Sequence, residues 1–296
     1  MEHTKIKKIL CPVDFSPFSI RAYHYASSIA QHNGAKLFVQ HVIEIWKYPA
    51  VSFMQGPDQY DEFCAELIAS GRDEVSKFLN KHQRGGIHPD CIVQQGVASD
   101  CILSLAQEKA IDLIVIGTHG LHGFDRLLLG SVTEEVLRRA LCPVLAVHHS
   151  TRSFAESLTE ERPTELREIL CGVDFSQFSD RACEYAFSLA AEYGAHLTLI
   201  HVLEGAHKLH VKEKTEKADQ ALRKLIPGES TKQDRITTTV RVGSPYKEIT
   251  QLASENKADL IVMGMQGHDS LDDAVFGSTT YRVVQLGHCP VLAVHA

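Results

Sequence analysis

The sequence predicts an α/β protein made of two tandem doubly wound domains, each a five-stranded parallel sheet with helices on both faces. Two observations carry this prediction. The chain repeats itself, and each copy alternates short, β-branched apolar runs with longer amphipathic stretches. Near-continuous apolar runs are typical of parallel strands covered on both faces. Right-handed crossovers between such strands give an open, doubly wound sheet.

The internal repeat keeps its order along the chain. Residues 9–22 (ILCPVDFSPFSIRA) match residues 169–182 (ILCGVDFSQFSDRA) at 11 of 14 positions. Residues 142–149 (CPVLAVHH) match residues 289–296 (CPVLAVHA), and two further segments match between these ends. Ordered matches of this kind indicate a duplication.

The repeat also sets the domain boundaries that we expect. Domain 1 covers residues 1–149, a linker covers 150–165, and domain 2 covers 166–296; the linker is polar, aperiodic and contains a proline. The copies are 160 positions apart at their start and 147 at their end, so the first copy carries about 13 extra residues. We place much of this surplus in a loop around Trp46–Pro57.

Each copy contributes five strands and a matching set of helices. The strands are expected at Ile9–Val13, Leu37–Val42, Ile92–Gln95, Leu113–Ile116 and Val144–Val147, then at Ile169–Val173, Leu197–Val202, Ile236–Val242, Leu260–Met263 and Val291–Val294. Helical patterns in the first copy cover Ser19–Gln31, Asp58–Lys81, Ser99–Lys109 and Ser131–Leu141.

Composition excludes several classes of protein. The formal charge is −7 and the only basic block is Lys5–Lys8, which disfavours a nucleic-acid partner. No apolar run is long enough for a transmembrane helix, and no apolar region follows the N-terminus as in a secretory signal. The eight cysteines form no CxxC pair, as expected for reduced core cysteines. We expect a cytoplasmic protein with no membrane contact.

Two features converge on the carboxyl edge of each predicted sheet. Asp14 and Asp174 end the first strands, where a carboxylate could accept hydrogen bonds from a ribose or a base; the alternative is ordinary helix-start chemistry. The fourth strands run into loops of identical spacing. These loops hold Gly117, Gly120, Gly130 and Ser131 in the first copy, and Gly264, Gly267, Gly277 and Ser278 in the second.

Glycine followed by serine at a helix start offers backbone N–H groups, a hydroxyl and the positive end of the helix dipole, which favours a phosphate site. The alternative is a glycine-rich turn with a serine N-cap and no ligand. Neither GxxxxGK[ST] nor GxGxxG after the first strand is present, which disfavours a P-loop or a dinucleotide site. Val42 and Val202, near the ends of the second strands, are candidates for packing on a base, or for the core.

With this motif pair, and with CPVLAV ending both copies, the sequence resembles the universal stress protein family. The resemblance implies a Rossmann-like fold of the adenine nucleotide α-hydrolase type and bound ATP, with or without Mg²⁺. It implies pairing of the two fifth strands within the chain, and allows a homodimer. It implies a stress-response regulator in which ATP acts as a switch. The residues implied to hold the nucleotide are Asp14, Val42, Gly117, Gly120, Gly130, Ser131 and Val132, with Asp174, Val202, Gly264, Gly267, Gly277, Ser278 and Thr279 in the second copy.

The copies differ inside the loop, and unequal sites follow as a prediction. Where the loop of the first copy has Arg126, the loop of the second copy has carboxylates, among them Asp269 and Asp272. Carboxylates repel a triphosphate. Pro12 becomes Gly172. We expect the first copy to bind ATP better.

Other functions remain as alternatives: a scaffold that binds no nucleotide, or a slow ATPase. No catalytic residues are assigned, because His119 has no counterpart in the second copy and no nucleophile–base order recurs. The aromatic segment Trp46–Tyr60 is expected to be a surface loop, with a lid or a partner contact as alternatives. Histidine pairs lack a complete metal-ligand set, so no metal is expected. The pairs are His119 with His122, His148 with His149, and His207 with His210.

Overall fold

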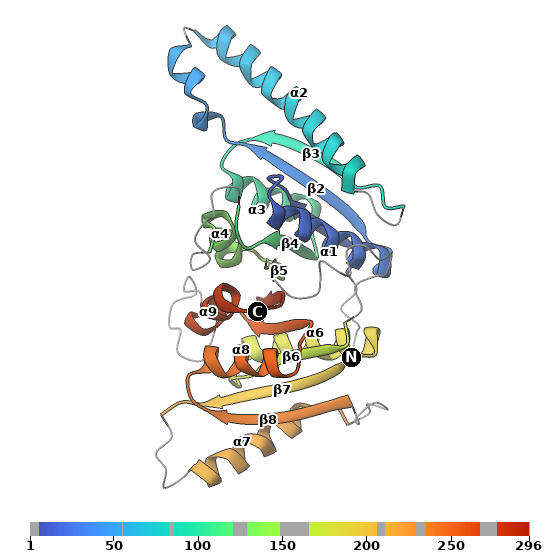
Figure 1. Ribbon diagram of the computed structural model, residues 1–296, viewed down its shortest axis with the longest axis vertical. Helices are drawn as coiled ribbons and strands as arrows, with labels where there is room; N and C mark the ends of the chain where they lie inside the picture. Colours follow the sequence, from blue (N-terminus) through green and yellow to red (C-terminus); the bar gives the residue numbers. More distant parts are fainter. Residues whose placement is uncertain are drawn as a thin grey trace.

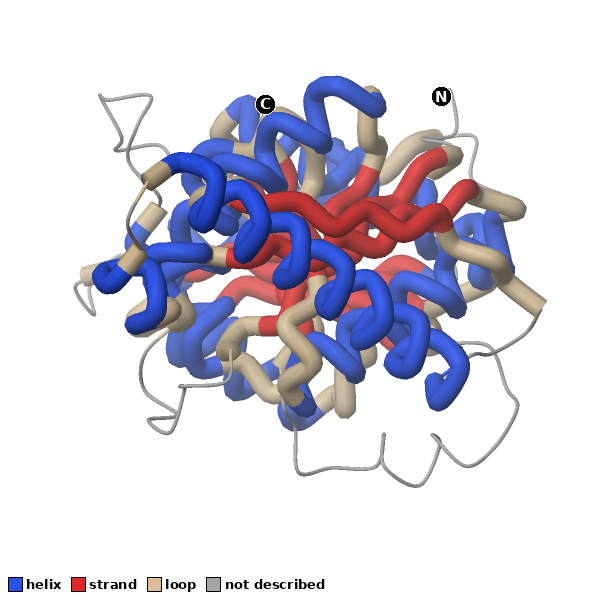
Figure 2. The backbone as a smooth tube through the Cα atoms, turned by 90° about the horizontal axis from the view of Figure 1, so that it is seen from above, coloured by secondary structure: helices blue, strands red, loops and turns tan. Residues whose placement is uncertain are grey.

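The computed structural model describes residues 6–54, 56–82, 86–120, 129–148, 166–205, 211–228, 235–266 and 277–295. The predicted linker at 150–165 lies outside the described residues. All ten strands join one sheet in the order β3-β2-β1-β4-β5-β10-β9-β6-β7-β8. Pairing is parallel within each half of the chain and antiparallel only between β5 and β10. Helices lie on both sides of the strands (Figures 1 and 2).

The elements agree closely with the expected ones. The strands of the first half are β1 (Lys8–Pro12), β2 (Lys36–Ile43), β3 (Asp90–Gln95), β4 (Leu113–Gly117) and β5 (Val144–Val147). Those of the second half are β6 (Glu168–Gly172), β7 (His196–Leu203), β8 (Ile236–Val242), β9 (Leu260–Gly264) and β10 (Val291–Val294). The α-helices are α1 (Pro17–Asn33), α2 (Pro57–His82), α3 (Ala98–Lys109), α4 (Ser131–Arg139), α6 (Gln177–Tyr193), α7 (Val211–Leu225), α8 (Pro245–Glu255) and α9 (Ser278–Leu286).

Alternate residues of the buried strands form two apolar layers. In β1, Ile9 and Cys11 face one layer, while Leu10 faces the other. The first layer includes side chains of α1, α2, α6 and α7 from both halves, and the second includes α3, α4, α8 and α9. The core is therefore continuous across the two halves, and it leaves the strand ends available for a site.

The extra length of the first half lies mainly in a helix. Helix α2 has 26 residues, whereas the equivalent α7 has 15. The expected loop around Trp46–Pro57 lies between β2 and α2, and it contains the 3₁₀ turns η1 (Ile45–Lys47) and η2 (Pro49–Phe53). The segment from β2 to α2 has 13 residues where that from β7 to α7 has 7, so the surplus is shared between the expected loop and the helix. Tyr60 belongs to α2 and not to the loop.

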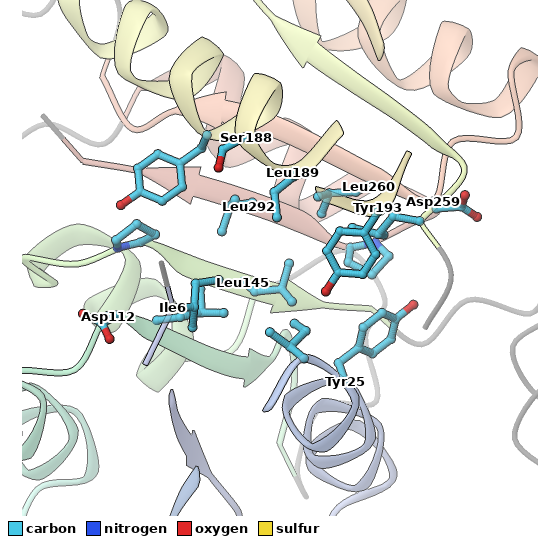
Figure 3. A pocket seen from close by; sticks show the side chains of 16 residues that line it. Ile6, Tyr25, Asp112, Leu145, Ser188, Leu189, Tyr193, Asp259, Leu260 and Leu292 are labelled. Carbon is cyan, nitrogen blue, oxygen red and sulfur yellow. The ribbon is translucent and has the colours of Figure 1, made fainter. Parts of the chain in front are cut away.

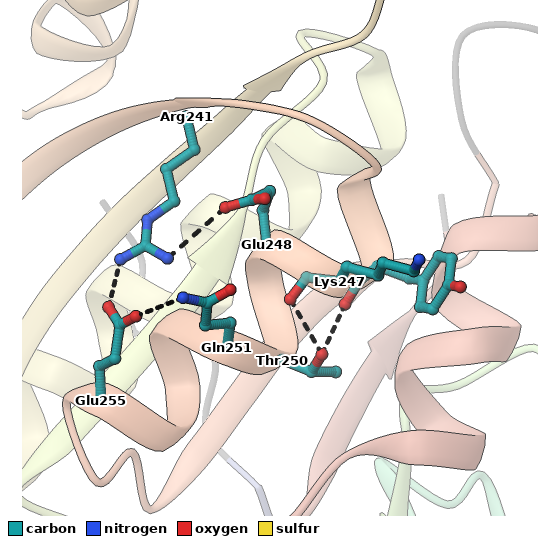
Figure 4. Close-up of polar contacts among 7 residues, drawn as sticks. Arg241, Lys247, Glu248, Thr250, Gln251 and Glu255 are labelled. Carbon is teal, nitrogen blue, oxygen red and sulfur yellow. Dashed lines mark hydrogen bonds and ion pairs between the residues drawn. The ribbon is translucent and has the colours of Figure 1, made fainter.

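Strand β8 forms one edge of the sheet and is tied to the helix that follows it (Figure 4). The Arg241 guanidinium lies 3.6 Å from Glu248 Oε2 and also pairs with Glu255, both on α8. Gln251 donates to the Glu255 carboxylate at 2.8 Å. Hydrogen bonds from Arg241 and Gln251 lower the pKa of Glu255. These contacts fix α8 over the outer strands of the second half.

The two halves meet where β5 and β10 pair antiparallel, with Ala146 opposite Val291. Both residues are fully buried. Next to this seam, between α1 and α6, lies an apolar pocket whose lining comes from both halves (Figure 3). Tyr25 and Tyr185 occupy equivalent positions in its wall. The seam is therefore closed by strand pairing and by facing helices.

Two histidines, one from each half, each bond to a helix of the other half across the seam. His148 follows β5, and its Nε2 bonds the carbonyl of Val284 in α9. His295 follows β10, and its Nε2 lies 3.0 Å from the carbonyl of Leu137 in α4. His148 is buried and bonded to backbone; His149, with which it was paired in the sequence, lies outside the described residues.

The buried His148 predicts a loss of stability in acid. Burial lowers the pKa of His148 to about 4. A histidine in the unfolded chain has a pKa near 6.5. Between that pH and the lower pKa of the folded protein, the residue is protonated in the unfolded chain but neutral in the folded one. The free energy of unfolding therefore falls between about pH 6.5 and pH 4, by roughly 3 kcal/mol in total.

Urea denaturation at several pH values measures this slope. We expect His148→Gln to reduce it, and His88→Gln, at an exposed position, to leave it unchanged. Identical slopes for the wild type and His148→Gln would rule out His148 as the group responsible.

Candidate functional site

The candidate site lies where the strand order reverses in each half. Strand β1 lies between β2 and β4, and β6 lies between β7 and β9. Ligands of open α/β sheets bind beyond the carboxyl ends of strands at such a reversal. Asp14 follows β1 and Gly117 ends β4; Asp174 and Gly264 occupy the same places in the second half.

The Asp14 carboxylate is held by the turn that follows β1. Its Oδ1 accepts a hydrogen bond from Ser16 N at 3.0 Å, and Ser16 caps α1 by accepting from Ser19 N at 3.2 Å. These two hydrogen bonds are the ordinary helix-start contacts that the alternative interpretation of Asp14 predicts. The other oxygen faces the glycine loop, because a Cβ added to Gly120 would lie 2.8 Å from Asp14 Oδ2. With no side chain at residue 120, the backbone of the loop lies close to this carboxylate without displacing it.

Gly130 joins the same group of residues. Its N–H donates to the Thr118 carbonyl at 2.9 Å, and an added Cβ would lie 3.8 Å from Gly120 N. Asp14, Gly120 and Gly130 are thus brought together at the end of β4. In the second half Gly277 N donates to the Met265 carbonyl at 2.9 Å in the same way. Gly267 lies outside the described residues.

The start of α4 differs from the alternative considered in the sequence. Gly130 is the N-cap and no side chain caps the helix, so a serine N-cap at residue 131 is wrong. Ser131 is the first helical residue and is exposed, and Val132 is half-buried. Helix α9 repeats this with Gly277 as N-cap, Ser278 exposed and Thr279 half-buried. Uncapped N–H groups and the positive dipole end favour an anion here.

Gly117 and Gly264 have a packing role that needs no ligand. A Cβ on Gly117 would lie 2.9 Å from the carbonyl carbon of Phe18, and one on Gly264 would lie 2.8 Å from that of Phe178. Each glycine therefore allows the first helix to cross the end of the fourth strand. Their presence in both halves is explained by this close approach, whatever the loop binds.

Val42 and Val202 lie near the carboxyl ends of β2 and β7 and are half-buried. Val42 is opposite Gln94 of β3, and Val202 is opposite Arg241 of β8. Val202 packs against the second apolar layer, as the core alternative expects. Both valines are adjacent to the first strand of their half, on the side away from the glycine loop.

Sequence reasoning missed the histidines that anchor the aspartate turns. His41 Nδ1 lies 2.9 Å from the Val13 carbonyl, and its ring centroid is 4.6 Å from that of Phe15. His201 repeats this with Val173 at 2.7 Å and with Phe175 at 4.6 Å. Phe15 (φ 63°) has a left-handed backbone, a strained conformation for a side chain of its size, and so does its counterpart Phe175. The matching histidine in both copies was the available signal.

Two buried threonines were also missed. Thr133 Oγ1 donates to the Gly117 carbonyl at 2.7 Å, and Thr280 Oγ1 donates to the Gly264 carbonyl at the same distance. Each bond ties the helix after the glycine loop to the end of the fourth strand. The described ends of each loop are therefore held together by a threonine that recurs in the two halves.

The halves differ on the wall of the site. In the first, Thr118 Oγ1 lies 3.0 Å from His119 Nδ1, and the His119 ring lies 5.0 Å from that of Phe18. In the second, the equivalent residues are Met265, which is buried, and Gln266. Arg126 and the acidic residues of the second loop, among them Asp269 and Asp272, lie outside the described residues.

The strand before the site differs as well. Gly172 stands where the first half has Pro12, and a Cβ there would overlap the Met263 sulfur. The methionine thus occupies space that a side chain at 172 would need. The two halves therefore pack differently where the first and fourth strands of each half lie side by side.

Two kinds of feature are absent from the described part of the chain. No group of three or more His, Cys, Asp or Glu side chains there is arranged to hold a metal ion. No helix there has both the length and the apolar character required to cross a membrane.

Comparison with known proteins identifies the relatives of the chain. The universal stress protein family profile matches residues 5–148 and 165–295. A universal stress protein of Methanocaldococcus jannaschii is 32% identical over 142 residues, which are 48% of this chain and 81% of that protein. One of Mycolicibacterium smegmatis is 24% identical over 300 residues, covering 97% of this chain and 96% of that protein.

A solved structure shares the whole architecture. The crystal structure of a universal stress protein from Archaeoglobus fulgidus superposes with a TM-score of 0.70 at 23% identity. The match covers 99% of this chain and 97% of that one. At this level of identity the likeness concerns the fold.

Proposed function

We propose that this chain, which belongs to the universal stress protein family, binds an adenine nucleotide at the carboxyl end of β1 and β4 and acts as a regulator that ATP switches. The observation that carries the proposal is the approach of Asp14 Oδ2 to Gly120 beside the uncapped start of α4. A carboxylate for the ribose or base and an anion site for phosphates then lie at one strand reversal.

The roles of the residues follow from their places. Asp14 Oδ2 would accept from the nucleoside, while Val42 would pack on the base. The backbone of Gly120, Gly130 and Val132, with the Ser131 hydroxyl, would surround the phosphates. Mg²⁺ would bind through the phosphate oxygens, because the described residues offer no cluster that could hold it alone.

The second half is proposed as the weaker site. It keeps Asp174, Val202, Gly264, Gly277, Ser278 and Thr279, and Gly267 in sequence. However, Met265 and Gln266 replace the polar Thr118 and His119, and the loop sequence adds carboxylates. Like charges oppose a triphosphate, so ATP should occupy the first half at lower concentration.

Nucleotide content is the test. Purified protein is denatured, the released nucleotides are identified by chromatography, and calorimetric titrations with ATP, ADP and AMP are made with and without Mg²⁺. We expect ATP to be released or to bind, with one site much tighter than the other. If no nucleotide is released and none binds with Mg²⁺ present, the chain is a scaffold. Tighter binding of AMP than of ATP would refute the triphosphate switch.

A further inference from the structure

The segment that runs from β2 into α2 stands at one end of the molecule (Figure 1), and several of its aromatic side chains are exposed. We define the aromatic–acidic patch as Trp46, Tyr48, Phe53 and Tyr60 together with the carboxylates Asp58, Asp61, Glu62 and Glu66. Exposed fractions are 56% for Trp46, 41% for Tyr48, 82% for Phe53 and 38% for Tyr60. Half of the large apolar side chains exposed in the described residues thus fall within 15 positions, and such clusters mark interaction surfaces.

The patch is a built surface with its own small core. Ile45 and Cys64 are buried against each other, with Val51 and Leu67 packed on them. The Tyr48 and Phe63 rings meet edge to face at 6.1 Å, which joins the 3₁₀ turns to α2. Trp46, Tyr48, Phe53 and Tyr60 nonetheless remain exposed beside this small core.

The carboxylates form one stripe on the first half of α2. Asp58, Glu62 and Glu66 follow one another at intervals of four, with Asp61 alongside, so they share a helix face. All four are exposed, and no ion pair involves any of them within the described residues. Residues 57–71 contain no lysine or arginine. Asp58 lies in the first turn of α2, where a carboxylate suits the helix dipole, but like charges four residues apart along the stripe repel one another.

The second half shows that the patch is dispensable for folding. It builds the same crossover from β7 to β8 with the 15-residue α7, whose first half carries lysines. No exposed aromatic residue occurs among the described residues of that crossover. The aromatic–acidic patch is thus an addition to the first half alone, and its residues need another explanation.

We propose that the aromatic–acidic patch binds a cationic amphipathic peptide segment of a partner protein. Arginine and lysine side chains would pair with the carboxylates and stack on the exposed rings, while apolar side chains would cover Trp46 and Phe53. The stripe from Asp58 to Glu66 spans about 12 Å, which matches about two turns of a bound helix.

Two other occupants fit less well. A second copy of the chain meeting patch to patch would bring the acidic stripes together. An anionic membrane surface would repel the same carboxylates. Charge thus selects a basic partner, and this inference does not depend on nucleotide binding.

Trp46 is the only tryptophan of the chain, so its fluorescence reports on the patch directly. The probe is a 12-residue amphipathic peptide of arginine and leucine. Control peptides replace the arginines with glutamate or the leucines with serine. We expect the arginine–leucine peptide to shift Trp46 emission to shorter wavelength, with affinity falling as salt rises.

Variants separate charge from apolar contact. Combining Asp58→Asn, Asp61→Asn, Glu62→Gln and Glu66→Gln should weaken binding roughly tenfold or more. Phe53→Ser should weaken it while keeping Trp46 as reporter. Leu141→Ser, at an apolar position exposed to 78% elsewhere, is the matched control and should bind normally. Circular dichroism confirms that each variant is folded.

Three results would overturn the proposal. The first is an unchanged Trp46 emission with every peptide. The second is equal binding by the wild type and the charge-neutralised variant. The third is an emission shift that depends on protein concentration or on added lipid vesicles without peptide, which would assign the patch to a second copy or to a membrane.

Discussion

Gly130→Asp is expected to weaken ATP binding to the first half by at least about tenfold while leaving the fold intact. Gly130 has φ −62° and caps α4, so an aspartate is compatible with the backbone and is itself a favourable N-cap. Its Cβ would lie 3.2 Å from the Thr118 carbonyl, a tight contact that a small shift relieves. The added carboxylate, however, takes the place proposed for the phosphates and repels them.

Gly130→Asn separates charge from size in this experiment. Asparagine has nearly the same shape and also caps helices, so it should weaken binding less than aspartate does. Gly277→Asp, the equivalent change in the second half, should remove less of the ATP bound at low concentration. Isothermal titration of ATP into the wild type and these three variants measures the affinity of each. A larger loss from Gly277→Asp would reverse the proposed order of the two sites.

Val291→Asp is expected to destabilise the whole chain by about 4 kcal/mol or more. Val291 is fully buried in β10, paired with Ala146 of β5, and belongs to the second apolar layer. A carboxylate there would lack water and a counter-charge, and burying such a group is among the largest penalties a single substitution can bring.

Urea unfolding followed by circular dichroism measures the loss. Val242→Asp is the matched control, because Val242 ends the edge strand β8 and is 44% exposed. We expect it to cost about 1 kcal/mol or less. If the two variants proved equally stable, the seam between β5 and β10 would not be a closed part of the core.

Much of the fold could be predicted because its strands are buried on both faces. Val144–Val147 and Val291–Val294 were located to the residue, since an apolar run bounded by proline and histidine leaves little choice. Helix α1 was predicted two residues short at each end. The repeat supplied a second, independent copy of each pattern.

The errors have physical causes too. An insertion between two strands has the same length whether it extends a loop or a helix, so the surplus in α2 could not be separated from the segment at Trp46. The approach of Gly120 to Asp14 follows from topology and was anticipated as a shared edge. The bond from His41 to the Val13 carbonyl joins residues 28 positions apart and leaves no local pattern. Only its recurrence at His201 pointed to it.

The antiparallel seam has a consequence for how the two halves can diverge. Identical subunits that associate through such a seam must change both sites whenever they change one. Here a single chain supplies both β5 and β10. Either half is therefore free to accumulate substitutions in its own loop, as Met265 and Gln266 illustrate. One half can therefore keep its original binding function while the other changes, and the two halves still pair through β5 and β10.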